Sequence, residues 1–298
     1  MPYLLLACLS LLWGTSFLLI AIAARGFDPV SFALVRVSIG ALALWAISLT
    51  IERRWPRGRA LWLTLAAMAA FGQAIPFVLL GDAARRVSSG DLALMMGAAP
   101  IFAFVLSRLL GDGPPWTAAS ALGLGLGLVG VAVCVGGPGS GSLIGRAEGF
   151  VAAFFYAFGA TISRGPSRAV GPATAAAASM TLSAAALFVA WRVSGGSAAA
   201  LAAIPASSLT AMAALGVFNT ALAYLLYFTL VLRMGATFAA LNNYVVPFVG
   251  LLLGALVFGE PIAASAWVGL ALVIVGVALT GRAARGGSGP RLTAARPS

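Results

Sequence analysis

Few side chains in this sequence could carry out chemistry, and the polar ones that could lie inside long apolar runs. The 298 residues include 18 arginines but no histidine and no lysine, so the commonest general base and metal ligand is missing, as is the amine of Schiff-base enzymes. Four amides remain in apolar surroundings: Gln73, Asn219, Asn242 and Asn243. The apolar runs hold no nucleophile–base pair, metal-ligand cluster or carboxylate pair. The sequence therefore predicts no enzyme and no bound metal or cofactor.

The four amides could either recognise a ligand or fasten helices together. An amide both donates and accepts hydrogen bonds, so it can contact the carboxylate or the ammonium group of a zwitterion. The same side chains also form hydrogen bonds between membrane helices, of about 0.6–2 kcal/mol each. The sequence leaves both interpretations open.

Aromatic and methionine side chains deep in the apolar runs could line a binding cavity. Trp13 and Tyr156 are the strongest candidates, because each lies close to a glycine (Gly14 and Gly159) beside which a ligand or a second backbone can approach. Most deep aromatic residues simply pack against their neighbours, and that alternative stays open. The candidates of this kind are Trp13, Phe17, Phe77, Met95, Met96, Tyr156, Tyr224 and Tyr244.

Three further residues could control helix shape or gating. Pro100 and Pro247 fall in the middle of two apolar runs, where a proline removes one backbone hydrogen bond and frees a carbonyl. We expect both helices to bend there during a conformational change, the alternative being static kinks satisfied by neighbouring helices. Arg36 is the one basic residue well inside a run. We expect a structural or gating role for it rather than substrate contact, because arginine can extend to the membrane interface from that depth.

The elements that position these residues are predicted to be membrane-spanning helices. Of all residues, 61% are hydrophobic and 8% are charged, which leaves too few polar groups to cover the core of a water-soluble protein. A bilayer-crossing helix needs about 20 apolar residues. We predict an all-α membrane protein with ten transmembrane helices, at 3–24, 31–51, 60–81, 89–110, 116–136, 146–164, 172–194, 206–232, 236–258 and 262–281.

The two halves of the sequence look like copies of one another. Pro100 aligns with Pro247 at an offset of 147 residues, and glycines and loop acids recur at nearly the same offset. Each half holds five predicted helices, and because five is odd the second half must enter the membrane inverted. Inverted repeats are typical of alternating-access transporters, whose sites lie near the midplane between the repeats. We expect repeats over 1–136 and 146–281 and a disordered tail over 282–298.

The glycines of one predicted helix and the acids of two loops have local interpretations. The run from Gly123 to Gly130 contains GxGxxG, but it lies inside a membrane helix, so we expect close helix packing rather than a dinucleotide site. Asp112 and Glu260 follow a glycine at corresponding places in the two halves. We expect each to stabilise the positive N-terminal end of the helix that follows it.

The arginines predict how the chain sits in the membrane. With the N-terminus inside, 12 arginines fall on the inner side and five on the outer side, and the positive-inside rule then places both termini in the cytoplasm. The net charge of +11 is thus a topology signal, and we expect no nucleic-acid partner.

Several motifs together resemble a known family. The first helix opens with Leu12-Trp13-Gly14-Thr15-Ser16-Phe17, and Arg36 lies early in the second helix. Each half has a proline in the middle of a helix and a closing Gly-Asp or Gly-Glu loop. The glycine-rich last helix runs from Trp267 to Gly276. Over residues 3–281 this resembles the ten-helix EamA-type exporters of the drug/metabolite transporter superfamily. The resemblance implies export of small metabolites from a bacterial cytoplasm, with the aromatic amino-acid exporters as the branch to name.

The residues and the resemblance together predict a transporter in a bacterial inner membrane. Its partners would be a small-molecule substrate and the lipid bilayer, and we expect a monomer, with an oligomer left open. Aromatic and methionine walls with a few amides suit an amino acid with an apolar side chain. A multidrug exporter of quaternary cations is the alternative, although a buried carboxylate would then be expected, and a lipid flippase is a third possibility.

Overall fold

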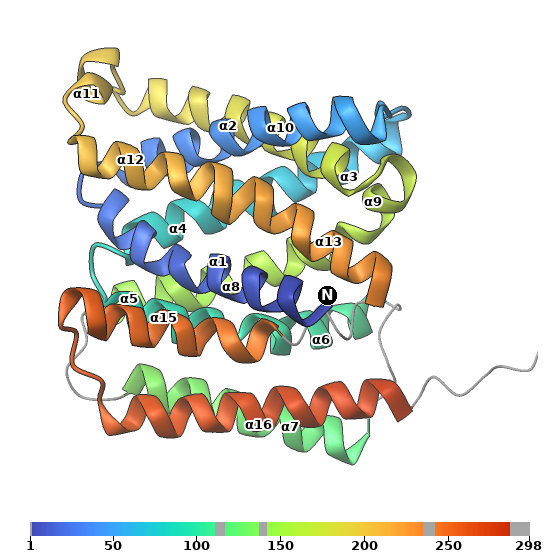
Figure 1. Ribbon diagram of the computed structural model, residues 1–298, viewed down its shortest axis with the longest axis vertical. Coiled ribbons are helices and arrows are strands. Elements are labelled where there is room, and N and C mark those ends of the chain that lie inside the picture. Colours follow the sequence, from blue (N-terminus) through green and yellow to red (C-terminus); the bar gives the residue numbers. More distant parts are fainter. Residues whose placement is uncertain (1, 111–116, 137–141, 235–241, 287–298) are drawn as a thin grey trace, which may run out of the picture.

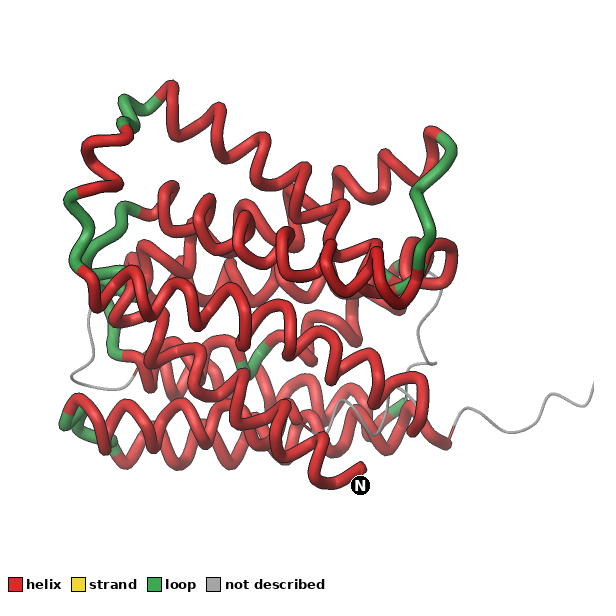
Figure 2. Tube along the Cα trace, turned by 45° about the horizontal axis from the view of Figure 1, so that its top comes forward, coloured by secondary structure: helices red, strands yellow, loops and turns green. Residues whose placement is uncertain are grey.

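The protein is a bundle of helices stacked in layers (Figure 1). The computed structural model describes residues 2–110, 117–136, 142–234 and 242–286, and every regular element within these ranges is helical. The connecting loops gather at two opposite ends of the bundle (Figure 2). Long apolar runs favour this arrangement because a helix satisfies all its backbone hydrogen bonds internally. The all-α class predicted from the sequence is confirmed.

Seven helical segments in the described residues are long and apolar enough to cross a membrane. Three shorter apolar helices occupy the predicted ranges that remain, at Ala118–Gly130, Val245–Phe258 and Ala264–Gly276. The seven long segments are Pro2–Ala23, Pro29–Glu52, Arg59–Ala83, Ser89–Leu109, Leu143–Ile162, Pro172–Val193 and Ala206–Tyr227.

Within its described residues, the first half of the chain contains seven α-helices and two π-helical segments, and several predicted spans are composites of these. They are α1 (Pro2–Ala23), α2 (Pro29–Ile47), η1 (Ser48–Glu52), α3 (Arg59–Ala69), η2 (Ala70–Ala74), α4 (Ile75–Ala83), α5 (Ser89–Met96), α6 (Ala99–Leu109) and α7 (Ala118–Gly136).

The second half adds two short connecting helices that the sequence did not predict, α9 and α11. Its elements are α8 (Leu143–Ile162), α9 (Arg164–Val170), α10 (Pro172–Val193), α11 (Ala198–Ala202), α12 (Ala206–Ala214), η3 (Leu215–Leu222), α13 (Ala223–Met234), α15 (Asn242–Phe258) and α16 (Ala264–Gly286). The predicted tail over 282–298 is corrected in part, because α16 continues through Gly286. The rest of that tail lies outside the described residues, as does Asp112.

Helices of the two halves alternate through the bundle. The principal neighbours are α7 with α16, α2 with α10, α1 with α15 and α4 with α8, and each of these pairs takes one helix from each half. The largest buried apolar cluster includes Phe32 and Phe77 from the first half and Met180 and Leu215 from the second. A space enclosed by these helices is therefore shared between the halves.

Two π-helical segments occupy corresponding places in the halves. Gln73 lies in η2 and Thr220 in η3, and the offset of 147 residues that pairs Pro100 with Pro247 also pairs these two. In η3 the Thr220 hydroxyl donates to the Leu215 carbonyl over 2.9 Å. Such wide turns interrupt the regular succession of side chains along a helix and occur often at functional sites.

Pro100 and Pro247 differ in their effect on the backbone. The predicted fourth span breaks at Gly97 and Ala98, so that Pro100 lies in the first turn of α6, where the missing N–H would have no partner in any case. Pro247 lies inside the unbroken helix α15. The expectation of two equivalent bends is therefore corrected: the fourth span is interrupted at Gly97 and Ala98, whereas α15 runs through Pro247 without a break.

Two glutamates cap helices of the opposite half. Glu52, at the end of η1, accepts hydrogen bonds from the Ala173 N–H (3.0 Å), the Thr174 N–H (2.7 Å) and the Thr174 hydroxyl (2.7 Å) at the start of α10. The two N–H contacts satisfy unpaired donors of the first helical turn, and the carboxylate places negative charge at the positive end of the helix.

Glu260 makes the corresponding contacts at the start of α5. It accepts from the Ser89 N–H and hydroxyl, both at 2.9 Å, and from the Gly90 N–H at 3.1 Å. The prediction that Glu260 stabilises the helix following it is therefore wrong, because the Gly259 turn (φ 66°) directs the carboxylate back toward the first half. The two capped helix starts, those of α5 and α10, lie at opposite ends of the bundle (Figure 1).

The glycine run of α7 packs against α16, as predicted. A Cβ added to Gly276 would lie 2.5 Å from the Gly123 carbonyl oxygen and 2.7 Å from the Gly127 nitrogen. Contacts this close are possible only between residues without side chains. The pair α7–α16 forms the outermost layer at one edge of the bundle (Figure 1).

Candidate functional site

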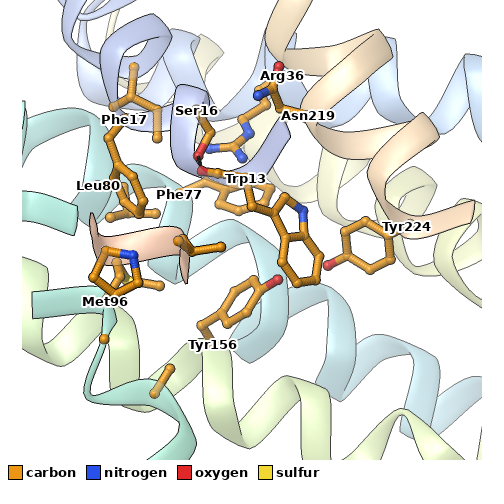
Figure 3. A pocket seen from close by; sticks show the side chains of 15 residues that line it. Trp13, Ser16, Phe17, Arg36, Phe77, Leu80, Met96, Tyr156, Asn219 and Tyr224 are labelled. Atoms are coloured by element: carbon orange, nitrogen blue, oxygen red, sulfur yellow. Dashed lines mark hydrogen bonds between the residues drawn. The ribbon is translucent and has the colours of Figure 1, made fainter. Parts of the chain in front are cut away.

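A cavity of about 90 Å³ lies between the two halves of the bundle (Figure 3). The first half contributes residues from α1, α2 and α4 and from the break between α5 and α6, and the second contributes residues from α8, η3, α13 and α15. The lining residues are Trp13, Ser16, Phe17, Ile20, Arg36, Phe77, Leu80, Met96, Gly97, Ala99, Tyr156, Asn219, Tyr224, Val246 and Pro247.

Aromatic rings form one wall of the cavity. The Trp13 ring centroid lies 6.4 Å from that of Tyr224 in an edge-to-face arrangement and 5.4 Å from that of Tyr227. Tyr156, from α8, points its hydroxyl toward that of Tyr224, so rings from both halves meet here (Figure 3). Rings packed in this way present a rigid apolar surface with a polar edge.

Polar groups occupy the other side. Asn219 connects η3 to α1, since its Nδ2 donates to the Leu12 carbonyl and, over 3.1 Å, to the Thr15 hydroxyl. Arg36 is 6% exposed, and its Cζ lies 4.0 Å from the centroid of the Phe77 ring. The cavity therefore combines apolar faces with one buried cation.

The fourth span is broken beside the cavity. Met96, Gly97 and Ala99 line it at the point where α5 ends and α6 begins. The Met96 carbonyl has no donor four residues ahead, because Pro100 lacks an N–H. The C-terminal end of a half-helix carries partial negative charge, and membrane transporters use such ends to bind cationic groups.

A second hollow, of about 420 Å³, lies at the end of the bundle where Glu260 caps α5. It is separated from the central cavity by about one helical turn: Ile20 and Leu80 line the cavity, whereas Ala24 and Ala84 line the hollow. Its lining residues are Ala21, Ala24, Arg25, Ala84, Arg85, Val87, Ser89, Phe258 and Glu260.

Most of the side chains that the sequence singled out meet at the central cavity. These are Trp13, Phe17, Arg36, Phe77, Met96, Tyr156, Asn219, Tyr224 and Pro247. Asn219 satisfies both interpretations of the amides at once, because it lines the cavity and fastens two helices together.

Gln73 and Met95 do not line the cavity, and the prediction is corrected for both. Gln73 donates to the Ser179 hydroxyl over 2.9 Å, because the π-helical turn directs it between spans toward α10. Met95 is 1% exposed, and its sulfur packs on Gly149 of α8. Successive residues of an α-helix point about 100° apart around its axis, so Met95 lies on a different face of α5 from Met96.

The remaining candidates fall at the edges of the site. Pro100 lies just beyond the helix break, next to the lining residue Ala99. Asn242 is fully buried at the start of α15, one turn before the lining residue Val246. The side chains of Asn243 and Tyr244 lie outside the part of the chain whose side chains the structure describes.

The sequence interpretation missed several small and aliphatic lining residues. Ser16 and Ile20 follow Trp13 at spacings of three and seven residues, which places all three on one face of α1. Helical spacing from Trp13 could have identified them. Gly97 and Ala99 become accessible only through the break in the fourth span, which helical spacing does not predict.

Comparisons with known proteins agree with this architecture. The chain is 26% identical over 278 residues to the uncharacterized inner membrane transporter YedA of Escherichia coli K12, covering 92% of this chain and 88% of that protein. It is 32% identical over 98 residues to the uncharacterized transporter YdfC of Bacillus subtilis, 33% of this chain and 32% of that one. A crystal structure of 18% sequence identity shares the fold with a TM-score of 0.65, over 97% of this chain and 99% of that chain.

The family assignment rests on both halves of the sequence. The model of the EamA-like transporter family matches residues 1–136 and 143–282, which together make up most of the chain and include every residue that lines the cavity. The chain thus belongs to the EamA-like transporter family and is a multi-pass membrane transporter.

Proposed function

We propose that this transporter exports amino acids with aromatic or other apolar side chains, moving them by alternating access through the central cavity. The observation that supports this most directly is the composition of the cavity, whose aromatic wall, buried cation and adjacent helix break come from helices of both halves. Motion of one half against the other would open such a cavity first to one side and then to the other.

The proposed topology has ten crossings in two inverted repeats, 1–136 and 146–281, with both termini in the cytoplasm of a bacterium and the chain in its inner membrane. Three observations support it: the arginine bias of 12 against five, the π-helical segments at corresponding places, and the printed name of the Escherichia coli relative. We propose that the chain works as a monomer.

The size of the cavity also supports a change of conformation. A volume of about 90 Å³ is below the roughly 150 Å³ of an apolar cavity that admits benzene. An aromatic amino acid therefore enters only when the helices separate. A phospholipid would require a far larger opening, which disfavours a flippase.

The chemistry of the lining favours a zwitterion over a quaternary cation. The rings of Trp13, Tyr156 and Tyr224 can pack on an apolar side chain, and the Met96 carbonyl can accept from an ammonium group. A multidrug exporter of cations would use the same rings, but the described lining residues include no carboxylate to attract a cation.

Counterflow in proteoliposomes tests the proposed function. Vesicles preloaded with unlabelled substrate are mixed with labelled tryptophan, phenylalanine, threonine or a quaternary ammonium dye. We expect accumulation of tryptophan and phenylalanine above that of threonine, because the aromatic wall suits a ring. Accumulation of the dye without the amino acids would support the multidrug exporter instead.

Replacing Trp13 by alanine should lower tryptophan counterflow about tenfold or more, since stacking on an aromatic ring contributes about 0.5–1.5 kcal/mol beyond the buried area. The matched control is Trp55→Ala, because Trp55 is 57% exposed and distant from the cavity. Each variant loses one packed indole, since Trp13 contacts Tyr224 and Tyr227 and Trp55 stacks on Trp45, so counterflow is compared per folded protein. Equal counterflow in wild type and Trp13→Ala would show that the aromatic wall does not contact the substrate.

A further inference from the structure

Arg36 carries an unbalanced charge in the middle of the bundle. Its side chain extends from α2 into the cavity (Figure 3), is 6% exposed, and has Nε and Nη1 atoms that are buried without a hydrogen-bond partner among the described residues. Both ion pairs found within the described ranges involve Arg86 instead. A charged group at membrane depth is normally paired with an opposite charge or with carbonyl groups.

The acidic residues of the chain are committed elsewhere. Of the seven in the sequence, six lie in the described ranges, and none of these six lines the cavity. Glu52 and Glu260 cap helices, Asp28 caps α2, and Asp82 pairs with Arg86. The described part of the chain therefore supplies no counter-ion for Arg36.

The Phe77 ring accounts for only one face of the guanidinium. With Cζ 4.0 Å from the ring centroid, the cation rests on the aromatic ring, an interaction that holds it in place. The N–H groups on its edge are left to bind something else. A guanidinium edge matches the two oxygens of a carboxylate, with two parallel hydrogen bonds.

We propose that Arg36 binds the carboxylate of the transported molecule, so that this transporter selects compounds with a carboxylate attached to an apolar body. This replaces the structural or gating role expected from the sequence, and it rests on the function proposed above. Arg36 and the Met96 carbonyl would then engage the two charged ends of an amino acid while the aromatic wall holds its side chain. A quaternary cation would be repelled by the positive charge of Arg36, so the same site disfavours its binding.

Competition with three indole compounds tests this on the wild-type protein. L-Tryptophan has both charged groups, indole-3-propionate keeps only the carboxylate, and tryptophanamide keeps only the ammonium. We expect unlabelled tryptophanamide to compete with labelled tryptophan at least tenfold more weakly than tryptophan itself, because a hydrogen-bonded charge pair is lost. Indole-3-propionate should compete better than tryptophanamide. Equal competition by tryptophan and tryptophanamide would overturn the proposal, whatever the behaviour of any variant.

Variants of Arg36 give an independent result. Arg36→Gln should raise the half-saturating tryptophan concentration at least tenfold and abolish the discrimination against tryptophanamide, whereas Arg36→Lys should keep part of it. Arg192→Gln is the control, because Arg192 is exposed and donates to the Gly196 carbonyl. Wild-type discrimination in Arg36→Gln would contradict the proposal.

Binding measured without transport separates the two proposals. Ligand that binds the folded state raises the unfolding temperature of purified protein. Stabilisation by tryptophan and indole-3-propionate but not by tryptophanamide supports the carboxylate site even if counterflow is absent, in which case the transport proposal alone fails. If tryptophan shows counterflow but all three compounds raise the unfolding temperature equally, the transport proposal stands and the proposed carboxylate site at Arg36 is wrong.

Discussion

Removing the two carboxylate caps should shift the protein in opposite directions. With both termini in the cytoplasm, as proposed above, Glu260→Ala is expected to raise the access of an impermeant thiol reagent to the cavity from the outer side about tenfold or more, and Glu52→Ala to raise it from the inner side by a similar factor. The reporter is a cysteine at Ser16, which lines the cavity. Labelling rates in right-side-out and inside-out vesicles give the two values.

The expected opposition follows from where the caps lie. Each glutamate accepts three hydrogen bonds from a helix of the other half, Glu52 at one end of the bundle and Glu260 at the other. A cap of this kind contributes about 1–2 kcal/mol, and about 1.4 kcal/mol changes an equilibrium tenfold. Opening one side must separate the halves there, so loss of that cap favours the open state.

Asp28→Ala is the matched control for both substitutions. Asp28 also caps a helix, accepting from the Val30 and Ser31 N–H groups at 3.0 and 3.1 Å, but the helix is the one that follows it directly. Its loss should lower stability by about 1 kcal/mol without favouring either side. Identical labelling patterns in Glu52→Ala and Glu260→Ala would show that the caps do not hold opposite faces closed.

Gly276→Leu should separate α16 from α7 and lower the free energy of unfolding by about 2 kcal/mol or more. The added Cβ alone would lie 2.5 Å from the Gly123 carbonyl oxygen and 2.7 Å from the Gly127 nitrogen. Both are backbone atoms that cannot rotate aside, and overpacking of a close contact costs about 1–3 kcal/mol even when side chains can adjust. Unfolding in detergent, followed by circular dichroism, measures the loss.

The same glycine run offers a matched control in Gly125→Leu. A Cβ on Gly125 has no atom within 4 Å, so this substitution should leave stability unchanged or raise it slightly, since leucine is the better helix former. Equal destabilisation by Gly125→Leu and Gly276→Leu would mean that the loss arises from the glycines' flexibility rather than from the packing of the two helices.

The sequence predicts the helices well because the signals for them are local. Runs of about 20 apolar residues interrupted by turns such as Gly26-Phe27-Asp28-Pro29 give the positions of the spans, and α2 begins at Pro29. The site residues on α1 follow from the same periodicity, since Trp13 and Phe17 are four residues apart and share a face.

The errors arise where a residue's environment depends on distant segments. Gln73 leaves the expected face through a π-helical turn, and Met95 faces α8 while its neighbour Met96 faces the cavity. Glu260 contacts Ser89, which lies 171 residues earlier in the chain. Spacing within one helix carries none of this information.

Covalent closure of the cavity in the folded protein tests most directly whether it is the transport path. A single cysteine at Ser16, in a background where Cys8 and Cys134 are replaced by alanine, is reacted with a bulky thiol reagent after reconstitution. The chain folds before modification, so misfolding does not enter the result. A cysteine at Leu11, on the same helix but 55% exposed, is the control. Our account predicts that modification at position 16 abolishes tryptophan counterflow and that excess tryptophan slows the reaction, with neither effect at position 11. Full counterflow after complete modification at position 16 would contradict it.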